Sequence, residues 1–170
     1  MNRRSPAILF AVFWLIATWG CGPQPSLATD LKLTPTMSGY FDAGLNDQKH
    51  NRLLPSLTFE LSNTGTLPFT NVDLVVAFWE VGADGELDSK VIRGVANQPL
   101  EPGKKGEAIT VRSSVGYESE APRAEFFANQ RYRGFIIKVF AKRGGKQAKL
   151  GEFPVEARLL PAVSKDGSHP

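Results

Sequence analysis

The sequence of 170 residues has very few of the side chains on which catalytic and metal centres depend. It contains one cysteine, Cys21, and two histidines, His50 and His169. One cysteine cannot form a disulfide within the chain, and the histidines do not stand in the HxH or HExxH spacing of a metal site. The sequence also lacks glycine-rich phosphate-binding patterns and a Gly-x-Ser-x-Gly nucleophile motif. We therefore expect a non-enzymatic protein that binds no cofactor and no metal.

A large excess of one charge is also missing. The net charge is +3, and removing the first twenty residues leaves 18 basic and 17 acidic side chains. A nearly neutral chain is a poor match for nucleic acid, whose phosphates attract basic proteins. The acidic ladder Asp84, Glu86 and Asp88 does not continue into a calcium loop, because Val95 occupies the place of the final glutamate. We expect this ladder to be a solvated hairpin tip.

The first twenty residues have the organisation of a secretory signal. Arg3 and Arg4 precede an apolar run from Ala7 to Trp19. Thirteen apolar residues are too few to span a bilayer, which needs about 20. We expect residues 1–20 to direct export to the periplasm or the cell surface.

Two cleavage sites are open. Thr18-Trp19-Gly20-Cys21 resembles a bacterial lipobox, after which Cys21 becomes the lipid-modified N-terminus, followed by a tether over residues 21–30. The alternative is cleavage after Ser26-Leu27-Ala28, a small-x-small site that would release a soluble chain. The lipobox is the favoured interpretation, because the single cysteine stands where lipidation requires it.

The centre of the chain is residues 57–81, where two alternating runs flank a turn. Leu57, Phe59 and Leu61 share one face of the first run; the corresponding residues of the second are Val72, Leu74, Val76 and Phe78. A period of two predicts strands with one buried face. We interpret them as the central pair of strands in a β-sandwich.

Further strands are expected at Leu31–Thr34 as an edge, at Lys90–Val95, Ala108–Val111, Gly134–Phe140 and Leu150–Leu159. Hairpin turns are expected at Asp84-Gly85 and at Lys142–Lys146. About seven strands joined by glycine and proline turns favour an all-β fold, an immunoglobulin-like (fibronectin type III-like) antiparallel β-sandwich over residues 31–161. An open barrel is the alternative. Residues 162–170 form a polar tail that we expect to be disordered.

Two segments do not alternate. Met37–Arg52 is polar and aperiodic, and it predicts the longest loop. Glu118–Gln130 is the one helical candidate, with Ser119 as its cap and Pro122 in its first turn. We expect a short helix or turn there that crosses between the sheets.

The order of strands and turns resembles bacterial immunoglobulin-like modules of the CARDB or FxLYD type. The resemblance rests on the Asn-Thr-Gly turn at residues 63–65, the Asn71-Val72-x-Leu74-x-Val76-x-Phe78 strand and Leu100-x-Pro102-Gly103. In these modules both turns close hairpins of a sandwich. The resemblance covers residues 57–111 and implies an extracytoplasmic module that binds or scaffolds, without catalytic residues.

The charges are segregated along the chain. Residues 61–89 contain five acidic side chains and no basic ones, whereas residues 123–149 contain eight basic side chains and one acidic. A hairpin tip with Lys142, Arg143 and Lys146 would be a positive surface for anionic lipid or a cell-wall polymer. The favoured interpretation is that the two segments are neighbours and neutralise each other.

Two hypotheses for the function follow. The first is a lipid-anchored sandwich that binds or scaffolds another cell-envelope protein. The second is a carrier of a small ligand or carbohydrate, with the aromatic side chains Tyr40, Phe41 and Trp79 in its pocket. Arg131 and Arg133, which flank Tyr132, are further candidate contacts, although a strand entry with flanking charges is the commoner explanation for such a cluster.

Overall fold

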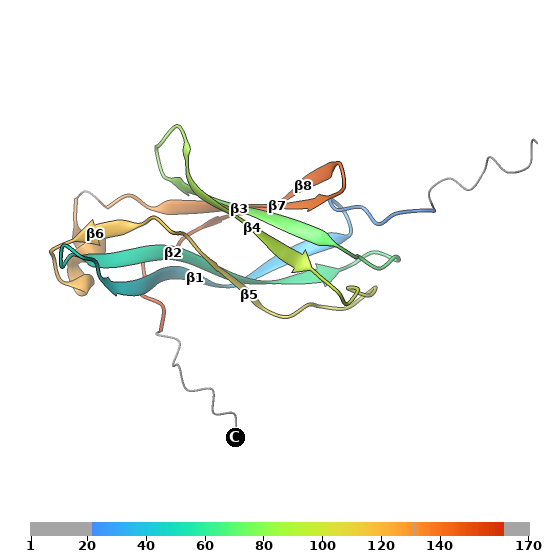
Figure 1. The fold of residues 1–170 in the computed structure, drawn as a ribbon, viewed down its shortest axis with the longest axis horizontal. Helices are drawn as coiled ribbons and strands as arrows, with labels where there is room; N and C mark the ends of the chain where they lie inside the picture. The colour runs from blue at the N-terminus through green and yellow to red at the C-terminus, as the bar shows by residue number, and fades with distance from the viewer. Residues whose placement is uncertain (1–21, 131, 162–170) are drawn as a thin grey trace, which may run out of the picture.

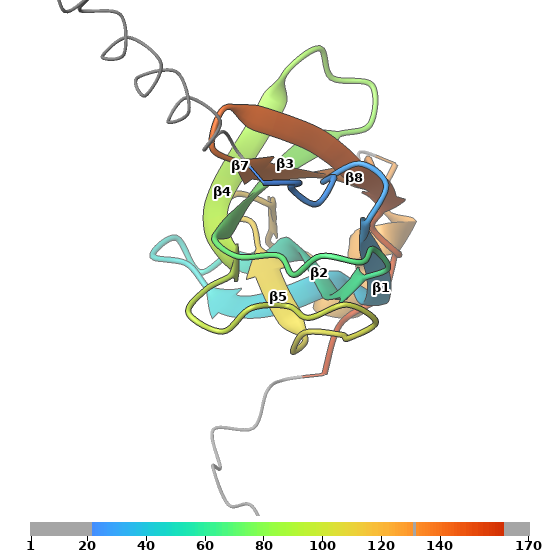
Figure 2. The ribbon, with the colours of Figure 1, turned by 90° about the vertical axis from the view of Figure 1, so that its right-hand side faces the viewer.

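The protein is a sandwich of two antiparallel sheets (Figures 1 and 2). The computed structural model describes residues 22–130 and 132–161, so the predicted signal, Cys21, Arg131 and the predicted tail lie outside the described residues. The first sheet contains β1 (Leu31–Leu45), β2 (Asn51–Asn63), β5 (Ile109–Arg112) and β6 (Tyr117–Ser119). The second contains β3 (Val72–Glu80), β4 (Glu86–Val95), β7 (Phe135–Arg143) and β8 (Lys146–Pro154). The predicted all-β sandwich is confirmed, with eight strands in place of about seven.

The two alternating runs supply the centre of the core. The seven apolar side chains predicted to share a buried face are all at most 1% exposed: Leu57, Phe59, Leu61, Val72, Leu74, Val76 and Phe78. β2 lies between β1 and the short strands β5 and β6, and β3 lies between β4 and β7. Each run is therefore the central strand of its sheet, and the two inner faces pack together.

β2 and β3 do not pair with each other, which corrects the hairpin that the resemblance implied. The chain from Asn63 to Val72 crosses from the first sheet to the second, and β3 pairs with β4 and β7. The Pro102-Gly103 turn lies on the second crossing, between β4 and β5. Phe69 and Leu100 exchange two backbone hydrogen bonds, so the crossings support each other. Both turns serve connections between the sheets.

The predicted loop Met37–Arg52 is wrong, because most of it is strand. β1 continues to Leu45 and β2 begins at Asn51, and the two strands pair along their length. The alternation fails because the pairing shifts between Pro35 and Met37 and again between Asp42 and Leu45. Such bulges move successive side chains off the two-residue period. As expected, β1 is an edge strand of the first sheet.

Both predicted hairpins are present. β3 and β4 are joined at residues 81–85, and β7 and β8 are joined at Gly144 and Gly145. β8 begins four residues before the predicted Leu150–Leu159 strand and ends five residues before it, since the chain leaves the second sheet after Pro154. Residues 158–160 then lie beside β1, where Tyr40 N–H donates to Arg158 O and Leu160 N–H donates to Tyr40 O. A side chain at Gly39 would collide with this segment.

The predicted helix over Glu118–Gln130 is only partly correct. Its first residues belong to β6, and one short 3₁₀ segment, Arg123–Ala128, follows. The Ser119 hydroxyl accepts a hydrogen bond from Ala121 N–H and caps no helix. The segment does connect the two sheets, as expected. Among the described residues, no helix has the length and apolar character needed to cross a membrane.

The packed domain begins earlier than residue 31. Leu27 is 6% exposed and belongs to the core cluster, and Ser26 N–H donates to the Asp30 carboxylate over 2.9 Å. Asp30 O in turn accepts the Thr64 N–H. The second half of the expected tether is therefore part of the fold, and the free connection to Cys21 is at most residues 22–25.

Leu27→Ala tests this boundary. Removing a buried leucine side chain typically costs about 2–5 kcal/mol, and we expect a loss near the lower end because the site is at the margin of the core. The measurement is urea unfolding of the chain that starts at Gly22. Gln24→Ala, an exposed neighbour, is the matched control and should leave the unfolding midpoint unchanged. Equal midpoints for the two variants would place Leu27 in a free tether.

Candidate functional site

Tyr40 lies in the core and not in a binding loop. Its side chain is fully buried, and its ring lies 5.3–6.3 Å, centre to centre, from those of Tyr117, Phe127, Tyr132 and Phe135. Its hydroxyl is 3.1 Å from the Tyr132 hydroxyl. Burial, followed by this hydrogen bond, raises the pKa of Tyr40 far above its ordinary value. The Tyr40 hydroxyl therefore has a hydrogen-bond partner, and its ring packs β1 against the 3₁₀ segment and β7.

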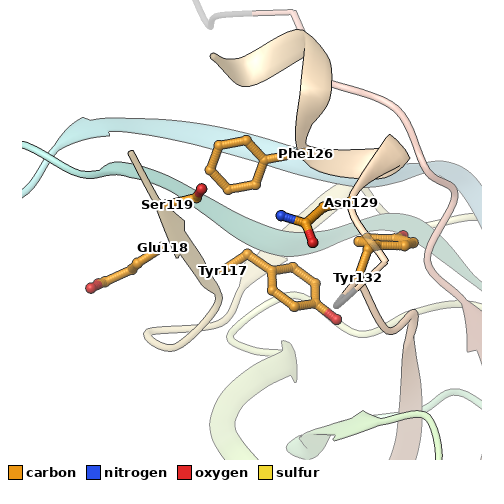
Figure 3. Close-up of a pocket in the computed structure, with 6 residues that line it drawn as sticks. All are labelled: Tyr117, Glu118, Ser119, Phe126, Asn129 and Tyr132. Carbon is orange, nitrogen blue, oxygen red and sulfur yellow. The ribbon is translucent and has the colours of Figure 1, made fainter. Parts of the chain in front are cut away.

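A small cavity lies beside this aromatic cluster (Figure 3). It encloses about 150 Å³ and is lined by Tyr117, Glu118, Ser119, Phe126, Asn129 and Tyr132. Pockets for drug-sized ligands measure about 300–1,000 Å³. The Tyr117 hydroxyl is engaged by Arg133 N–H at 2.5 Å, and burial raises the pKa of Tyr117 to about 12. The cavity is therefore smaller than a pocket for a drug-sized ligand, and the Tyr117 hydroxyl in its wall already has a hydrogen-bond partner.

The structure does not bring the three predicted aromatic residues together. Phe41 is on the outer face of the first sheet, where the Arg112 guanidinium lies 3.8 Å above its ring centre. Trp79 is on the outer face of the second sheet, half-buried, with Lys138 Nζ 4.0 Å from its ring centre. Tyr40 thus lies in the core, whereas Phe41 and Trp79 lie on the outer faces of different sheets.

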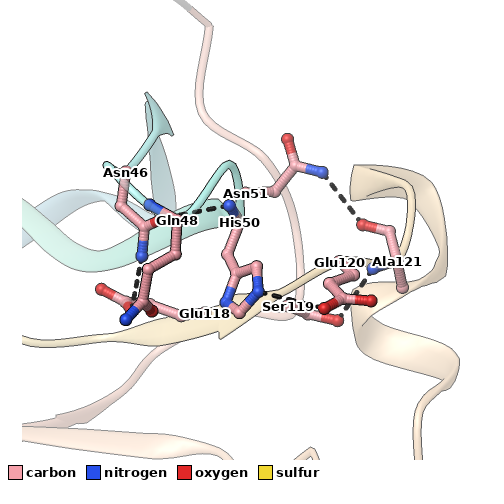
Figure 4. Close-up of polar contacts among 8 residues, drawn as sticks. All are labelled: Asn46, Gln48, His50, Asn51, Glu118, Ser119, Glu120 and Ala121. Atoms are coloured by element: carbon pink, nitrogen blue, oxygen red, sulfur yellow. Dashed lines mark hydrogen bonds and ion pairs between the residues drawn. The ribbon is translucent and has the colours of Figure 1, made fainter.

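His50 belongs to a polar contact between the β1–β2 turn and β6 (Figure 4). Its Nε2 lies 3.2 Å from Glu120 Oε1, and its backbone N–H donates to the Asn46 side chain. The Asn46 amide also donates to Glu118, at 2.9 Å. These contacts fasten a turn to a short strand. Within residues 22–130 and 132–161, no group of three or more His, Cys, Asp or Glu side chains could hold a metal ion.

Asp88 joins the two sheets along their β4–β5 side. It faces inward from the edge strand β4 and accepts hydrogen bonds from the Ser113 hydroxyl at 2.9 Å and from Ser114 N–H at 2.6 Å. Lys90, two residues on, donates to the Ser114 hydroxyl. Burial acts to raise the pKa of Asp88, but these hydrogen bonds and the Lys90 charge outweigh it and hold that pKa below its usual value. Asp88 is therefore structural, unlike Asp84 and Glu86 at the exposed tip.

Apolar side chains form a row on the outer face of the second sheet. The strand register places Val91 of β4 opposite Val75 of β3, and Val75 opposite Phe140 of β7. Val91 is 72% exposed, and the other two are half-buried. The alternation in the sequence did not reveal this row. It shows which residues share one face of a strand, but it does not show which strands are neighbours.

The predicted basic residues are divided between the two ends of the molecule. Lys142, Arg143 and Lys146 lie at the β7–β8 hairpin, whereas Arg133 precedes β7 at the opposite end. Arg143 contacts the Thr70 hydroxyl over 3.5 Å. Lys142 and Lys146 are exposed, and neither has an ion pair with another described residue.

The acidic and basic segments are neighbours, but their tips do not neutralise each other. β3 and β7 are antiparallel, with Asp73 opposite Lys142 at one end and Glu80 opposite Phe135 at the other. The tip with Asp84 and Glu86 and the basic β7–β8 tip consequently lie at opposite ends of the second sheet (Figure 1). Asp73, the acidic residue beside Lys142, is paired with Arg93 at 3.1 Å.

The two ends of the sandwich carry opposite net charge. At the end where β1 begins, residues 22–32, 63–73, 93–109 and 142–152 carry five acidic side chains and eight basic ones: Lys32, Arg93, Lys104, Lys105, Lys142, Arg143, Lys146 and Lys149. At the other end, residues 42–52, 80–88, 113–130, 132–134 and 153–161 carry ten acidic and five basic side chains. The sandwich is thus an electric dipole along its long axis, although its total charge is small.

Comparisons with known proteins give only distant structural matches. No protein-family model and no curated protein matches the sequence. Among solved structures, Bacteroides uniformis β-glucuronidase 2 matches 75% of this chain at 10% identity with a TM-score of 0.41, and this chain covers 12% of the glucuronidase. The ApaA protein of Bordetella pertussis matches 78% of this chain at 13% identity with a TM-score of 0.41, over 98% of its own length. At these scores the matches carry no argument about function, and the resemblance to CARDB or FxLYD modules stays a prediction.

Asp88→Asn tests the contact between the sheets. We expect this nearly isosteric change to lower the free energy of unfolding at neutral pH by about 1–2 kcal/mol, because hydrogen bonds to a charged acceptor are lost or weakened. A carboxylate with a lowered pKa stabilises the fold above its unfolded pKa of about 3.9 and ceases to do so as the pH falls through the folded value.

The difference between wild type and Asp88→Asn should therefore shrink below about pH 4. The measurement is urea unfolding across a pH series. Asp84→Asn, in the exposed turn of the same hairpin, is the control, and it should change the free energy of unfolding by less than about 0.5 kcal/mol. A pH-independent difference would assign the effect of Asp88 to packing instead of charge.

Proposed function

We propose that this protein is an exported, lipid-anchored β-sandwich that binds or scaffolds another protein of the cell envelope and catalyses no reaction. The signal-like residues 1–20 and the position of Cys21 motivate the export and the anchor. The observation that carries the anchor is the packing of Leu27, which bears on the choice between the two cleavage sites.

Cleavage after Ala28 would remove a part of the folded domain. The mature chain would begin at Thr29 and lose the buried Leu27, together with the Ser26 N–H that donates to Asp30. Cleavage before Cys21 retains both. Because losing the Leu27 side chain costs about 2 kcal/mol in a domain that is only marginally stable, the fold favours the site at Cys21. The chain would then be held at the membrane by a short connection.

The apolar row on the second sheet supports the binding role. Val91 is an exposed aliphatic residue on the free edge strand β4, and Val75 and Phe140 extend the apolar surface across two more strands. Exposed apolar surface on a sheet next to an unpaired edge is suited to a protein partner. The carrier hypothesis has less support, because Tyr40 is buried in the core while Phe41 and Trp79 lie on the outer faces of different sheets.

Cys21→Ser tests the anchor. In wild-type cells we expect the mature protein in the membrane fraction, with a mass that includes a lipid adduct on Cys21. The variant should lack the adduct, because a serine hydroxyl cannot replace the thiol as acceptor in this modification. Mass spectrometry of the N-terminal peptide is the measurement. A wild-type mature N-terminus at Thr29 without a lipid would refute the anchor.

A photocrosslinking amino acid at Val91 tests the partner surface. We expect irradiation of intact cells to give a discrete crosslinked product from position 91, because this side chain is the most exposed of the apolar row. The same amino acid at Thr110, an exposed position on the first sheet, is the matched control and should give none. Equal yields from the two positions would contradict binding through the second sheet.

A further inference from the structure

The β7–β8 hairpin lies next to the segment through which the chain leaves the domain toward Cys21. Residues 24–28 and residues 146–148 line one shared depression. Figure 2 looks onto this end of the sandwich, and the N-terminal segment passes beside β8 there. Any membrane that holds Cys21 is therefore on the same side of the molecule as Lys142, Arg143 and Lys146.

The connection to Cys21 is too short to let the domain move far from a membrane. Five residue steps separate Cys21 from Ser26, which is fixed to Asp30. A fully extended chain covers at most about 3.6 Å per residue, so the connection spans no more than about 18 Å. This is about two Debye lengths at physiological salt, which leaves the hairpin within or near the electrostatic reach of the headgroups.

The charges at this end have the sign and number for an anionic surface. Clusters of four to eight Lys and Arg beside a membrane attachment point are typical of proteins that contact anionic lipids. The four basic residues at 142, 143, 146 and 149 fall in one hairpin, and Glu152 is paired with Lys149 at 2.6 Å. Lys142 and Lys146 remain exposed, while the opposite end of the molecule carries a net negative charge that a negatively charged surface would repel.

We propose that the β7–β8 hairpin rests on the anionic phospholipid headgroups of the membrane to which Cys21 is attached. The contact orients the sandwich with its acidic end away from the bilayer, so that the apolar row on the second sheet stands free for a partner. The orientation rests on the proposed anchor, whereas the affinity of the hairpin for anionic lipid does not.

The first test is binding of the unlipidated chain that starts at Gly22, which keeps every packed residue, to vesicles. We expect binding to phosphatidylcholine vesicles that contain phosphatidylglycerol, weakening as salt is raised, and none to pure phosphatidylcholine. Lys142→Gln with Lys146→Gln should weaken binding about 25-fold, from about five-fold per charge. Lys49→Gln with Arg133→Gln removes the same charge at the other end and should leave binding unchanged.

Two outcomes of this test would overturn the proposal. One is equal loss of binding in both double variants, which would indicate a general charge effect. The other is binding to an anionic cell-wall polysaccharide, dependent on Lys142 and Lys146, without binding to the vesicles. Thermal melting of each variant shows whether it is folded. Since this chain carries no lipid, a failed anchor leaves the test valid, and a failed hairpin leaves the anchor standing.

The second test measures orientation in the lipidated full-length protein, reconstituted in the same vesicles. Gly145→Cys and Gly85→Cys place one fluorophore at each hairpin tip, and an added Cβ meets no atom within 4 Å at either position. A quencher on the lipid headgroups should reduce the fluorescence at position 145 and not at position 85, and only in anionic vesicles. Equal quenching at both tips, or quenching at 145 in neutral vesicles, would refute the orientation.

Discussion

Asn63 holds the point at which the chain leaves one sheet for the other. β2 and β3 bury their apolar faces only if they face each other, so the chain between them has to cross the end of the core. The Asn63 side chain, 1% exposed, donates to Leu67 O and Leu100 O and accepts from Gly65 N–H. Gly103 N–H donates to Asn63 O, so the second crossing is fixed to the same residue. Without this side chain, Leu67 O and Gly65 N–H would lose a partner, whereas Leu100 O would keep the Phe69 N–H. Leaving a buried polar group unpaired typically costs about 1–3 kcal/mol, and less where water reaches it.

This crossing also determines at which end of the sandwich the acidic and the basic hairpins lie. β3 starts beside Asn63 and runs away from that end, and β7 returns antiparallel to it. The hairpin after β3 therefore lies at one end, and the hairpin after β7 lies at the other. Charge blocks that adjoin along two paired strands are separated at their tips by the length of the sheet. A nearly neutral protein thus has two ends of opposite net charge. Local ion pairs on the surface would cancel and would not produce this separation of charge.

Alternation predicted the central strands because burial on one face repeats every two residues in β2 and β3. It failed for β1, where two bulges interrupt the period and the 158–160 segment covers Gly39 and Tyr40. It failed near Ser119 because a strand of three residues has no period to detect. Leu27 was placed in a tether because one apolar residue among polar and proline neighbours gives no pattern. Its burial depends on contacts with residues far along the chain.

The candidate site was less predictable than the fold, because it depends on which strands are neighbours. The sequence shows that Val75 and Phe140 are apolar, but only the register of the paired strands places them in one row with Val91. The basic hairpin was visible as well, while its relation to the acidic block was not. The same two blocks would neutralise each other if their tips met at one end, and they separate here because β3 and β7 are antiparallel. The strand direction, and not the composition, makes one end of this sandwich suited to an anionic surface.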